Sequence, residues 1–201
     1  MSNTLPRFIA AVNTKGGVGK TTTTIGTALA LVKLGYAVEV RDVDPQGSAT
    51  SWAMQARQAG TPLPFDVRVA NRMTVGEPPA DPDTWVLIDT PPSQSDLIGA
   101  AVDASSLVIL VSTPGRLDLE RMAQTRSNIG RASSVLLTQT KQGTVSLRDA
   151  EAFLTEHRIG RFDTMIPFRE GIRRATGTAT MPSATGYGSV AYEILQAWGL
   201  R

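Results

Sequence analysis

A glycine-rich stretch near the start of the chain, KGGVGKTTTT, carries the residues best suited to chemistry. It nearly fits the phosphate-loop pattern G-x-x-x-x-G-K-[ST], with Thr14 in place of the first glycine. In such a loop the backbone N–H groups surround phosphate oxygens, the lysine reaches the β- and γ-phosphates, and the next hydroxyl binds Mg²⁺. A glycine turn before an ordinary helix is the alternative for this stretch alone. The pattern predicts a nucleotide site formed by Gly16, Gly17, Val18, Gly19, Lys20, Thr21 and Thr22.

Lys15 is a second lysine in the same loop. Because Lys20 already holds the usual place, a lysine five positions earlier cannot easily share its phosphate oxygens. Phosphoryl transfer gains from an extra cation, which either the same chain or a neighbouring one can supply. Reaching a neighbouring subunit is the natural use of Lys15, and a solvated surface lysine is the alternative that the spacing leaves open.

Acidic residues follow two of the predicted strands. Asp89 ends the apolar run WVLID, as a Walker B aspartate that holds Mg²⁺ through water does. Asp42 and Asp44 come at the end of another run, in RDVDPQGS. Because open parallel sheets bind ligands at the carboxyl ends of their strands, we expect these acids to converge with the glycine loop on one crevice. In that crevice the acidic side chains would position a Mg²⁺ ion and a water molecule.

The elements that must position these residues alternate along the chain. Apolar runs predict buried strands at 8–12, 37–44, 85–89, 107–111 and 134–138, with a weak strand at 65–70. A helix follows the glycine loop, with Ile25, Ala28, Leu29 and Val32 on one face and Gly35 at its end. Further helical patterns cover 96–102, 117–129 and 189–198. This order predicts an α/β fold: a doubly wound, mostly parallel sheet with helices on both faces.

Two features break the pattern. The stretch 59–85 carries five prolines and is interpreted as a surface connection, because strands resume beyond it. In the second strand Glu39 and Arg41 share one face, so either that face is less buried or the two side chains pair. Residues 1–201 are therefore predicted to form a single domain.

Composition narrows the possible functions. The chain has no cysteine, which excludes disulfides, thiolate catalysis and cysteine-held metal clusters. Its single histidine, His157, argues against a histidine-based metal site or catalytic triad. A formal charge of +2 permits nucleic-acid contact without requiring it. The first residues do not resemble a signal peptide and no run is long enough to span a membrane, so we expect a cytoplasmic protein.

Three motifs together, KGGVGKTTTT, DVDPQGS and LIDTPP, resemble the ParA/MinD superfamily of deviant Walker A ATPases, and especially small ParA-type partition ATPases such as ParF. The likeness continues more loosely through LVILVSTPGRLDLERM, MIPFREGIRRA and GYGSVAYEILQAWG. It implies ATP and Mg²⁺ as ligands of a P-loop NTPase fold.

The resemblance also implies roles for single residues. Lys15 matches the lysine that crosses an ATP-bound sandwich dimer to the partner's phosphates, and it would act in catalysis with Lys20 and Asp44. Asp44 matches the aspartate that orients the attacking water, and Asp42 joins Thr21 and Asp89 around the metal. Thr138 stands where the family often has an asparagine that reads adenine, and Pro167 is a second candidate for the base.

The resemblance further implies a homodimer that binds DNA without sequence preference, on the nucleoid of a bacterium or archaeon. Hydrolysis, stimulated by a ParB-like adaptor, would position a plasmid, a chromosome region or a protein compartment. The basic segment FREGIRRA offers the DNA contacts through Arg169, Arg173 and Arg174. The weaker candidates lie outside this segment: Arg148, Arg158 and Arg161.

Three alternatives stay open at this point. MinD-like members bind lipid through a basic amphipathic helix, and no such extension follows EILQAWGLR, so membrane binding is disfavoured. A nucleotide-gated polymerising scaffold is the second alternative. A small-molecule ligase or kinase is the third, although the chain has little spare length for a substrate pocket.

Overall fold

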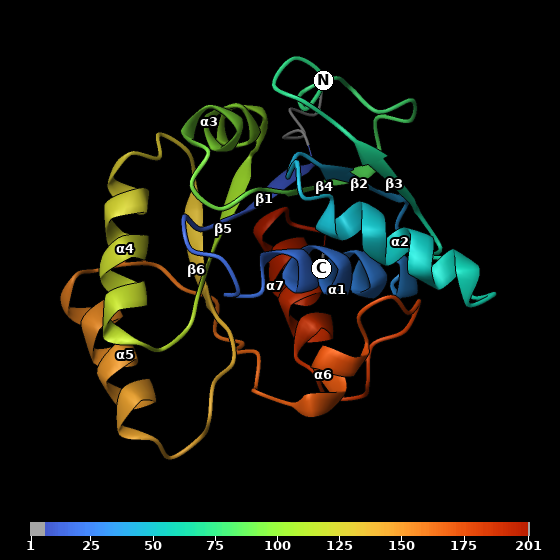
Figure 1. The fold of residues 1–201 in the computed structure, drawn as a ribbon. Coiled ribbons are helices and arrows are strands. Elements are labelled where there is room, and N and C mark those ends of the chain that lie inside the picture. Colours follow the sequence, from blue (N-terminus) through green and yellow to red (C-terminus); the bar gives the residue numbers. More distant parts are fainter. Residues whose placement is uncertain (1–6, 201) are drawn as a thin grey trace.

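One six-stranded sheet runs through the computed structural model, which describes residues 7–200. The strand order is β3-β2-β4-β1-β5-β6, and every described neighbouring pair is parallel. The predicted parallel α/β fold is therefore confirmed (Figure 1). Residues 1–6 and 201 of the predicted single domain lie outside the described residues. The strands are β1 (Phe8–Val12), β2 (Val38–Asp42), β3 (Asp66–Val69), β4 (Trp85–Asp89), β5 (Leu107–Ser112) and β6 (Ser133–Leu137).

Helices cover both faces of this sheet (Figure 1). One apolar core lies between the sheet and a first helix group: α1 (Lys20–Lys33), α2 (Ser48–Gln58), α6 (Glu170–Arg174) and α7 (Tyr187–Ala197). A second core lies under α3 (Ser95–Ala104), α4 (Arg116–Ser127) and α5 (Val145–Glu156). Across residues 7–200, no helix is long and apolar enough to cross a membrane.

The strands alternate their side chains between these two cores. In β1, Ile9 and Ala11 belong to the first core, whereas Phe8, Ala10 and Val12 belong to the second. Both sets are apolar because both faces are covered by helices, which is why the strand sequences show no alternation with polar residues. The unbroken apolar runs that predicted the strands thus reflect burial on both sides.

Helix α1 begins and ends close to where its sequence predicts. Ile25 and Ala28 are fully buried, while Leu29 and Val32 are half-buried against the same core. Gly35, with φ +92°, follows the helix end, and Tyr36 N–H donates to the Leu31 carbonyl to close the last turn.

Three helices were not predicted, and two of them carried a signal. Ala49, Trp52 and Ala56 in α2 are buried at i, i+3 and i+7, and α5 repeats this spacing. Helix α6 has only five residues and one buried apolar side chain, too few for a periodic pattern. The connection 59–85 contains β3, at the edge of the sheet, much as expected.

The polar pair in β2 is buried, which rules out a less buried face and leaves pairing as the explanation. Arg41 Nε donates to Glu39 Oε1 at 2.8 Å, and both residues are almost fully buried. Arg41 Nη1 also donates to the carbonyls of Val75 at 2.8 Å and Glu77 at 2.5 Å. The guanidinium therefore ties the proline-rich connection to the sheet.

Helices α1 and α7 approach each other closely at Gly26. A Cβ built on Gly26 would lie 2.5 Å from Cδ2 of Tyr187, so the tyrosine ring lies directly on the α1 backbone. A residue without a side chain is required at this position for the two helices to pack as they do.

Candidate functional site

The glycine loop joins β1 to α1 at the carboxyl edge of the sheet. Gly17 and Gly19 adopt positive φ angles of 78° and 96°, which residues with side chains rarely tolerate. Gly19 is the N-cap of α1, and none of the described side chains caps this helix end. The first N–H groups of α1 are therefore available to an anion, and the helix dipole favours negative charge there.

Asn13, which sequence reasoning missed, fixes the start of the loop. Its amide Nδ2 donates to the Val111 carbonyl at 2.6 Å, and its Oδ1 accepts from the Lys15 N–H at 2.7 Å. Asn13 is fully buried. A polar residue directly after an apolar strand was the available signal, because a buried amide needs partners and usually finds them in a loop.

The three predicted metal-site residues lie close together at the edge of the sheet. The register of β2 and β4 places Asp42 opposite Asp89. Thr21 Oγ1 donates to Asp89 Oδ2 at 2.7 Å, so the first turn of α1 joins the same cluster. Asp89 Oδ1 is buried without a hydrogen-bond partner among the described residues. A buried carboxylate oxygen without a partner beside a threonine hydroxyl fits a hydrated Mg²⁺ ion.

Burial perturbs both ionisable groups at the centre of the site. Burial raises the pKa of Asp89 to about 7, and the Thr21 hydrogen bond and the charge of Lys20 only partly oppose it. Burial also lowers the pKa of Lys20, against the opposing attraction of Asp89 and Asp44. Lys20 Nζ donates to the Lys15 carbonyl at 3.0 Å, so it lies over the loop. Charges held in a low-dielectric crevice of this kind are typical of functional sites.

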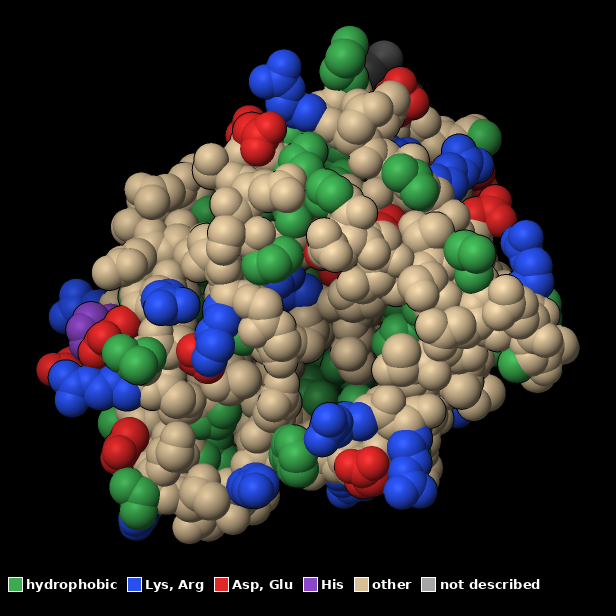
Figure 2. All heavy atoms as spheres, viewed as in Figure 1, with side chains coloured by type: hydrophobic (Ala, Val, Ile, Leu, Met, Phe, Trp, Pro, Cys, Tyr) green, Lys and Arg blue, Asp and Glu red, His purple; other side chains and the backbone are tan. Residues whose placement is uncertain are grey.

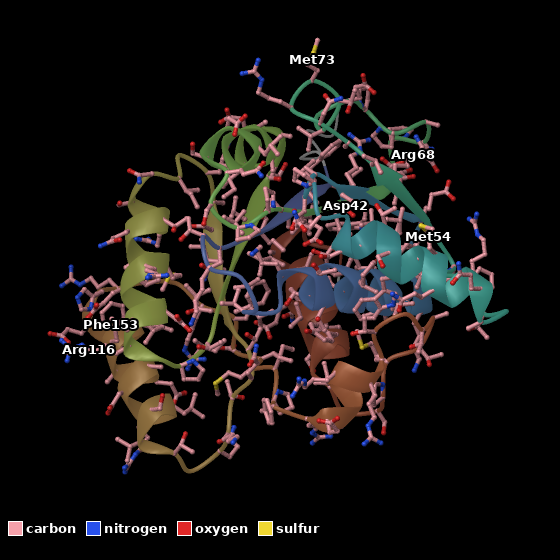
Figure 3. All side chains as sticks on the ribbon, in the orientation of Figure 1. Asp42, Met54, Arg68, Met73, Arg116 and Phe153 are labelled. Carbon is pink, nitrogen blue, oxygen red and sulfur yellow. The ribbon has the colours of Figure 1, made fainter. Side chains whose placement is uncertain are left out.

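Asp42 is the last residue of β2, whereas Asp44 lies in the loop that follows the strand. Asp42 Oδ2 accepts from both the N–H and the hydroxyl of Thr50, each at 2.8 Å, and so it holds the start of α2. In Figure 3 Asp42 lies between the sheet and α2. Asp44 Oδ1 accepts from the Gln46 N–H at 2.9 Å, and Asp44 lines the cavity described below.

Lys15 turns away from Lys20 and contacts helix α4. Its Nζ donates to Asp118 Oδ1 at 2.7 Å, and its side chain is 44% exposed, against 8% for Asp118. Thr113 Oγ1 donates to the other carboxylate oxygen of Asp118 at 2.5 Å. Burial on its own raises the pKa of Asp118, but these hydrogen bonds outweigh it and hold the pKa below its usual range. Asp118 was not predicted, since a lone acid in a helix carries no sequence signal.

A cavity of about 850 Å³ opens beside the loop. Its wall contains most of the predicted nucleotide residues together with two of the arginines expected to contact DNA: Gly16, Gly17, Gly19, Lys20, Thr21, Thr22, Asp44, Thr138, Pro167, Arg169 and Arg173. Figure 2 shows this face hollowed above α6, with Lys and Arg side chains at the lower edge of the hollow. Lys15, Val18, Asp42, Asp89 and Arg174 lie outside the lining.

A glycine loop at a helix N-terminus, with a lysine, a hydroxyl and a strand-end carboxylate, defines a P-loop nucleotide-binding protein. The family model described as the CobQ/CobB/MinD/ParA nucleotide binding domain matches residues 9–181. The chain belongs to this family, as the sequence motifs predicted.

Two curated relatives match the chain over nearly its whole length. It is 31% identical to the maintenance of carboxysome distribution protein A of Gloeobacter kilaueensis, over 98% of each chain. It is 29% identical to the chromosome-partitioning ATPase Soj of Thermus thermophilus, over 94% of this chain and 95% of the relative. The chain is thus related over nearly its whole length to ATPases of the ParA/MinD kind.

The fold is also that of a solved synthase. Cobyrinic acid a,c-diamide synthase from Mycobacterium smegmatis, with bound ADP and magnesium, matches with a TM-score of 0.71 at 22% identity, covering 97% of this chain and 96% of that one. The same synthase has also been solved with an ATP analogue and magnesium. At this identity the likeness concerns the fold.

Proposed function

We propose that this chain is a ParA-type ATPase that binds ATP and Mg²⁺ as one domain, forms an ATP-dependent sandwich dimer and hydrolyses ATP to position a cargo. The position of Lys15 carries the proposal. Lys20 lines the cavity at the phosphate end, whereas Lys15 lies outside the lining and half-exposed beside α4. A loop lysine that does not face its own cavity could reach the phosphates of a second copy once it leaves Asp118.

The residues at the sheet edge fit the proposed cofactor. Thr21 and Asp89 would hold Mg²⁺, with Asp42 close enough to raise the pKa of Asp89. Among residues 7–200, no cluster of three or more His, Cys, Asp or Glu side chains could hold an ion alone, so phosphate oxygens would complete the site. Bound Mg²⁺ would neutralise charge on the transferring phosphate. Asp44, in the cavity wall, would orient the attacking water.

DNA binding is the second part of the proposal. In a partition cycle, only the ATP-bound dimer would bind DNA. Basic side chains that contact DNA phosphates would give this binding without sequence preference. Of the three arginines in FREGIRRA, Arg174 lies outside the cavity lining, and its Nε is 3.4 Å from Glu170 Oε1. Nucleoid association and a ParB-like adaptor would then link the cycle to a cargo.

The carboxysome-distribution and chromosome-partitioning relatives favour cargo positioning over small-molecule synthesis. The synthase with the same fold keeps an ATP-dependent ligase as a competing hypothesis. A polymerising scaffold is the other competitor, and the free edge of β3, the outermost strand in the order β3-β2-β4-β1-β5-β6, is where such growth could begin.

Light scattering after size-exclusion chromatography tests the proposal. The wild-type chain should elute as a monomer with ADP, as a dimer with ATP, and with DNA when ATP is present. Lys15→Ala should bind ATP but stay monomeric and hydrolyse slowly, while Asp44→Ala should accumulate the dimer. Lys33→Ala, at the far end of α1, is the matched control for loss of a lysine. A Lys15→Ala variant that dimerises normally would overturn the proposed role, and particles much larger than a dimer would support the scaffold.

A further inference from the structure

Helix α6 presents two arginines to the cavity and a third away from it. Arg169 is the N-cap residue that precedes α6, and Arg173 lies four positions later, within the helix. Both line the cavity, together with Ile172 and Thr176, whereas Arg174 does not. The basic segment therefore has two faces with different surroundings.

The two cavity arginines also lack partners. Among the described residues, neither Arg169 nor Arg173 donates a side-chain hydrogen bond or forms an ion pair, while Arg174 pairs with Glu170 at 3.4 Å. Lys20 is the other basic residue of the lining, and Asp44 is its acidic one. The cavity wall thus carries an excess of positive charge, as a site for a polyphosphate would.

Thr138, the candidate for the adenine contact, lines the cavity and also contacts the glycine loop. This residue is almost fully buried, and its hydroxyl lies 2.7 Å from the Val18 carbonyl and 3.3 Å from the Ser112 carbonyl. Gln139 Nε2 likewise donates to the Gly17 carbonyl at 2.8 Å. The residues that follow β6 therefore hold the glycine loop in place, and they use the Thr138 hydroxyl hydrogen and the Gln139 amide group as donors to it.

We infer that Arg169 and Arg173 are nucleotide-binding residues, which close over the phosphates of ATP from the side opposite the glycine loop. The inference rests on the proposed function, because it takes ATP as the occupant of the cavity. Guanidinium groups bind phosphate oxygens through two parallel N–H bonds, and they are always charged. Their long side chains reach across a cavity of about 850 Å³ more readily than the backbone of α6 does. DNA contact is then left to Arg174 and other outward-facing residues.

Titration of each purified full-length variant with fluorescent MANT-ATP and Mg²⁺ tests this role. Arg173→Gln should raise the Kd for MANT-ATP about tenfold, the value of one charge-assisted hydrogen bond, and Arg169→Gln should act in the same direction. Arg72→Gln, which removes the same charge from an exposed position in the connection 59–85, outside the cavity, should leave the Kd unchanged. Circular dichroism melts of the three variants show whether each is folded.

A wild-type Kd in both Arg169→Gln and Arg173→Gln would overturn the inference. So would an unchanged Kd together with loss of DNA retention at saturating ATP, because the arginines would then serve DNA. A wild-type chain that fails to bind MANT-ATP would instead refute the proposed function, so the two failures are distinguishable.

Discussion

Asp118→Asn should strengthen the ATP-dependent dimer. In the single chain, Lys15 Nζ donates to Asp118 Oδ1 at 2.7 Å, and this contact must be released before Lys15 can reach a second copy. The substitution removes the charge that holds the lysine while keeping an oxygen for the hydroxyl of Thr113. Less free energy is then spent when the dimer forms.

The size of the effect follows from the exposure of the two partners. Hydrogen bonds to charged groups contribute about 1.5–3 kcal/mol when buried, but exposed ion pairs contribute only about 0.2–1 kcal/mol. With Lys15 44% exposed and Asp118 8% exposed, about 1 kcal/mol per chain is reasonable. Two chains release two contacts, so the dimer should gain about 2 kcal/mol, roughly a thirtyfold lower dissociation constant.

Sedimentation velocity over a concentration series, with a non-hydrolysable ATP analogue, measures this constant. Glu120→Gln is the matched control, because it removes one acid from the same helix and breaks only the exposed pair with Arg116 at 3.0 Å. Arg116, labelled in Figure 3, points away from the body of the protein. A dissociation constant for Asp118→Asn that equals or exceeds the wild-type value would refute the reasoning.

Asp89→Asn should raise the melting temperature of the nucleotide-free protein at about pH 8. Burial raises the pKa of Asp89 from 3.8 to about 7, so the free energy of unfolding of the wild type falls as pH rises between these values. A gain in melting temperature for Asp89→Asn that does not shrink toward acidic pH would contradict this account. Glu39→Ala should cost about 3 kcal/mol in urea unfolding, because it leaves the buried charge of Arg41 without its carboxylate; a loss below about 1 kcal/mol would mean that carbonyl partners suffice. Gly26→Ala should cost about 1–3 kcal/mol in the same assay, because its methyl group meets Tyr187, and wild-type stability would mean that α7 moves aside freely.

The sheet was predictable because its strands are apolar on both faces. Each run such as 85–89 is buried throughout, so its signal does not depend on register. The all-parallel order follows from the helices between strands, which lead the chain back to the same edge. Helices α2 and α5 were missed although their buried residues are regularly spaced.

The site divides in a similar way. The glycine loop, Asp44 and Asp89 are local motifs, and the sequence alone placed them at one edge. Contacts between distant segments carried no such signal: Lys15 and Asp118 are 103 positions apart, and Thr138 reaches Val18 across 120. The direction in which each arginine of α6 faces was also inaccessible, since a basic segment specifies charge but not orientation.

Because the ring of Tyr187 lies directly on Gly26, helix α7 is wedged against the helix that begins at the phosphate loop. The two helices cannot slide along each other without withdrawing that ring, so this contact fixes their relative position. Trp198 follows the end of α7 and packs edge-on against Trp85, with ring centres 5.1 Å apart, at the start of the strand that ends in Asp89. The indole pair therefore offers a built-in optical reporter: once Trp52 is replaced by phenylalanine, a change in tryptophan emission would report any displacement of α7 against β4 without an added label.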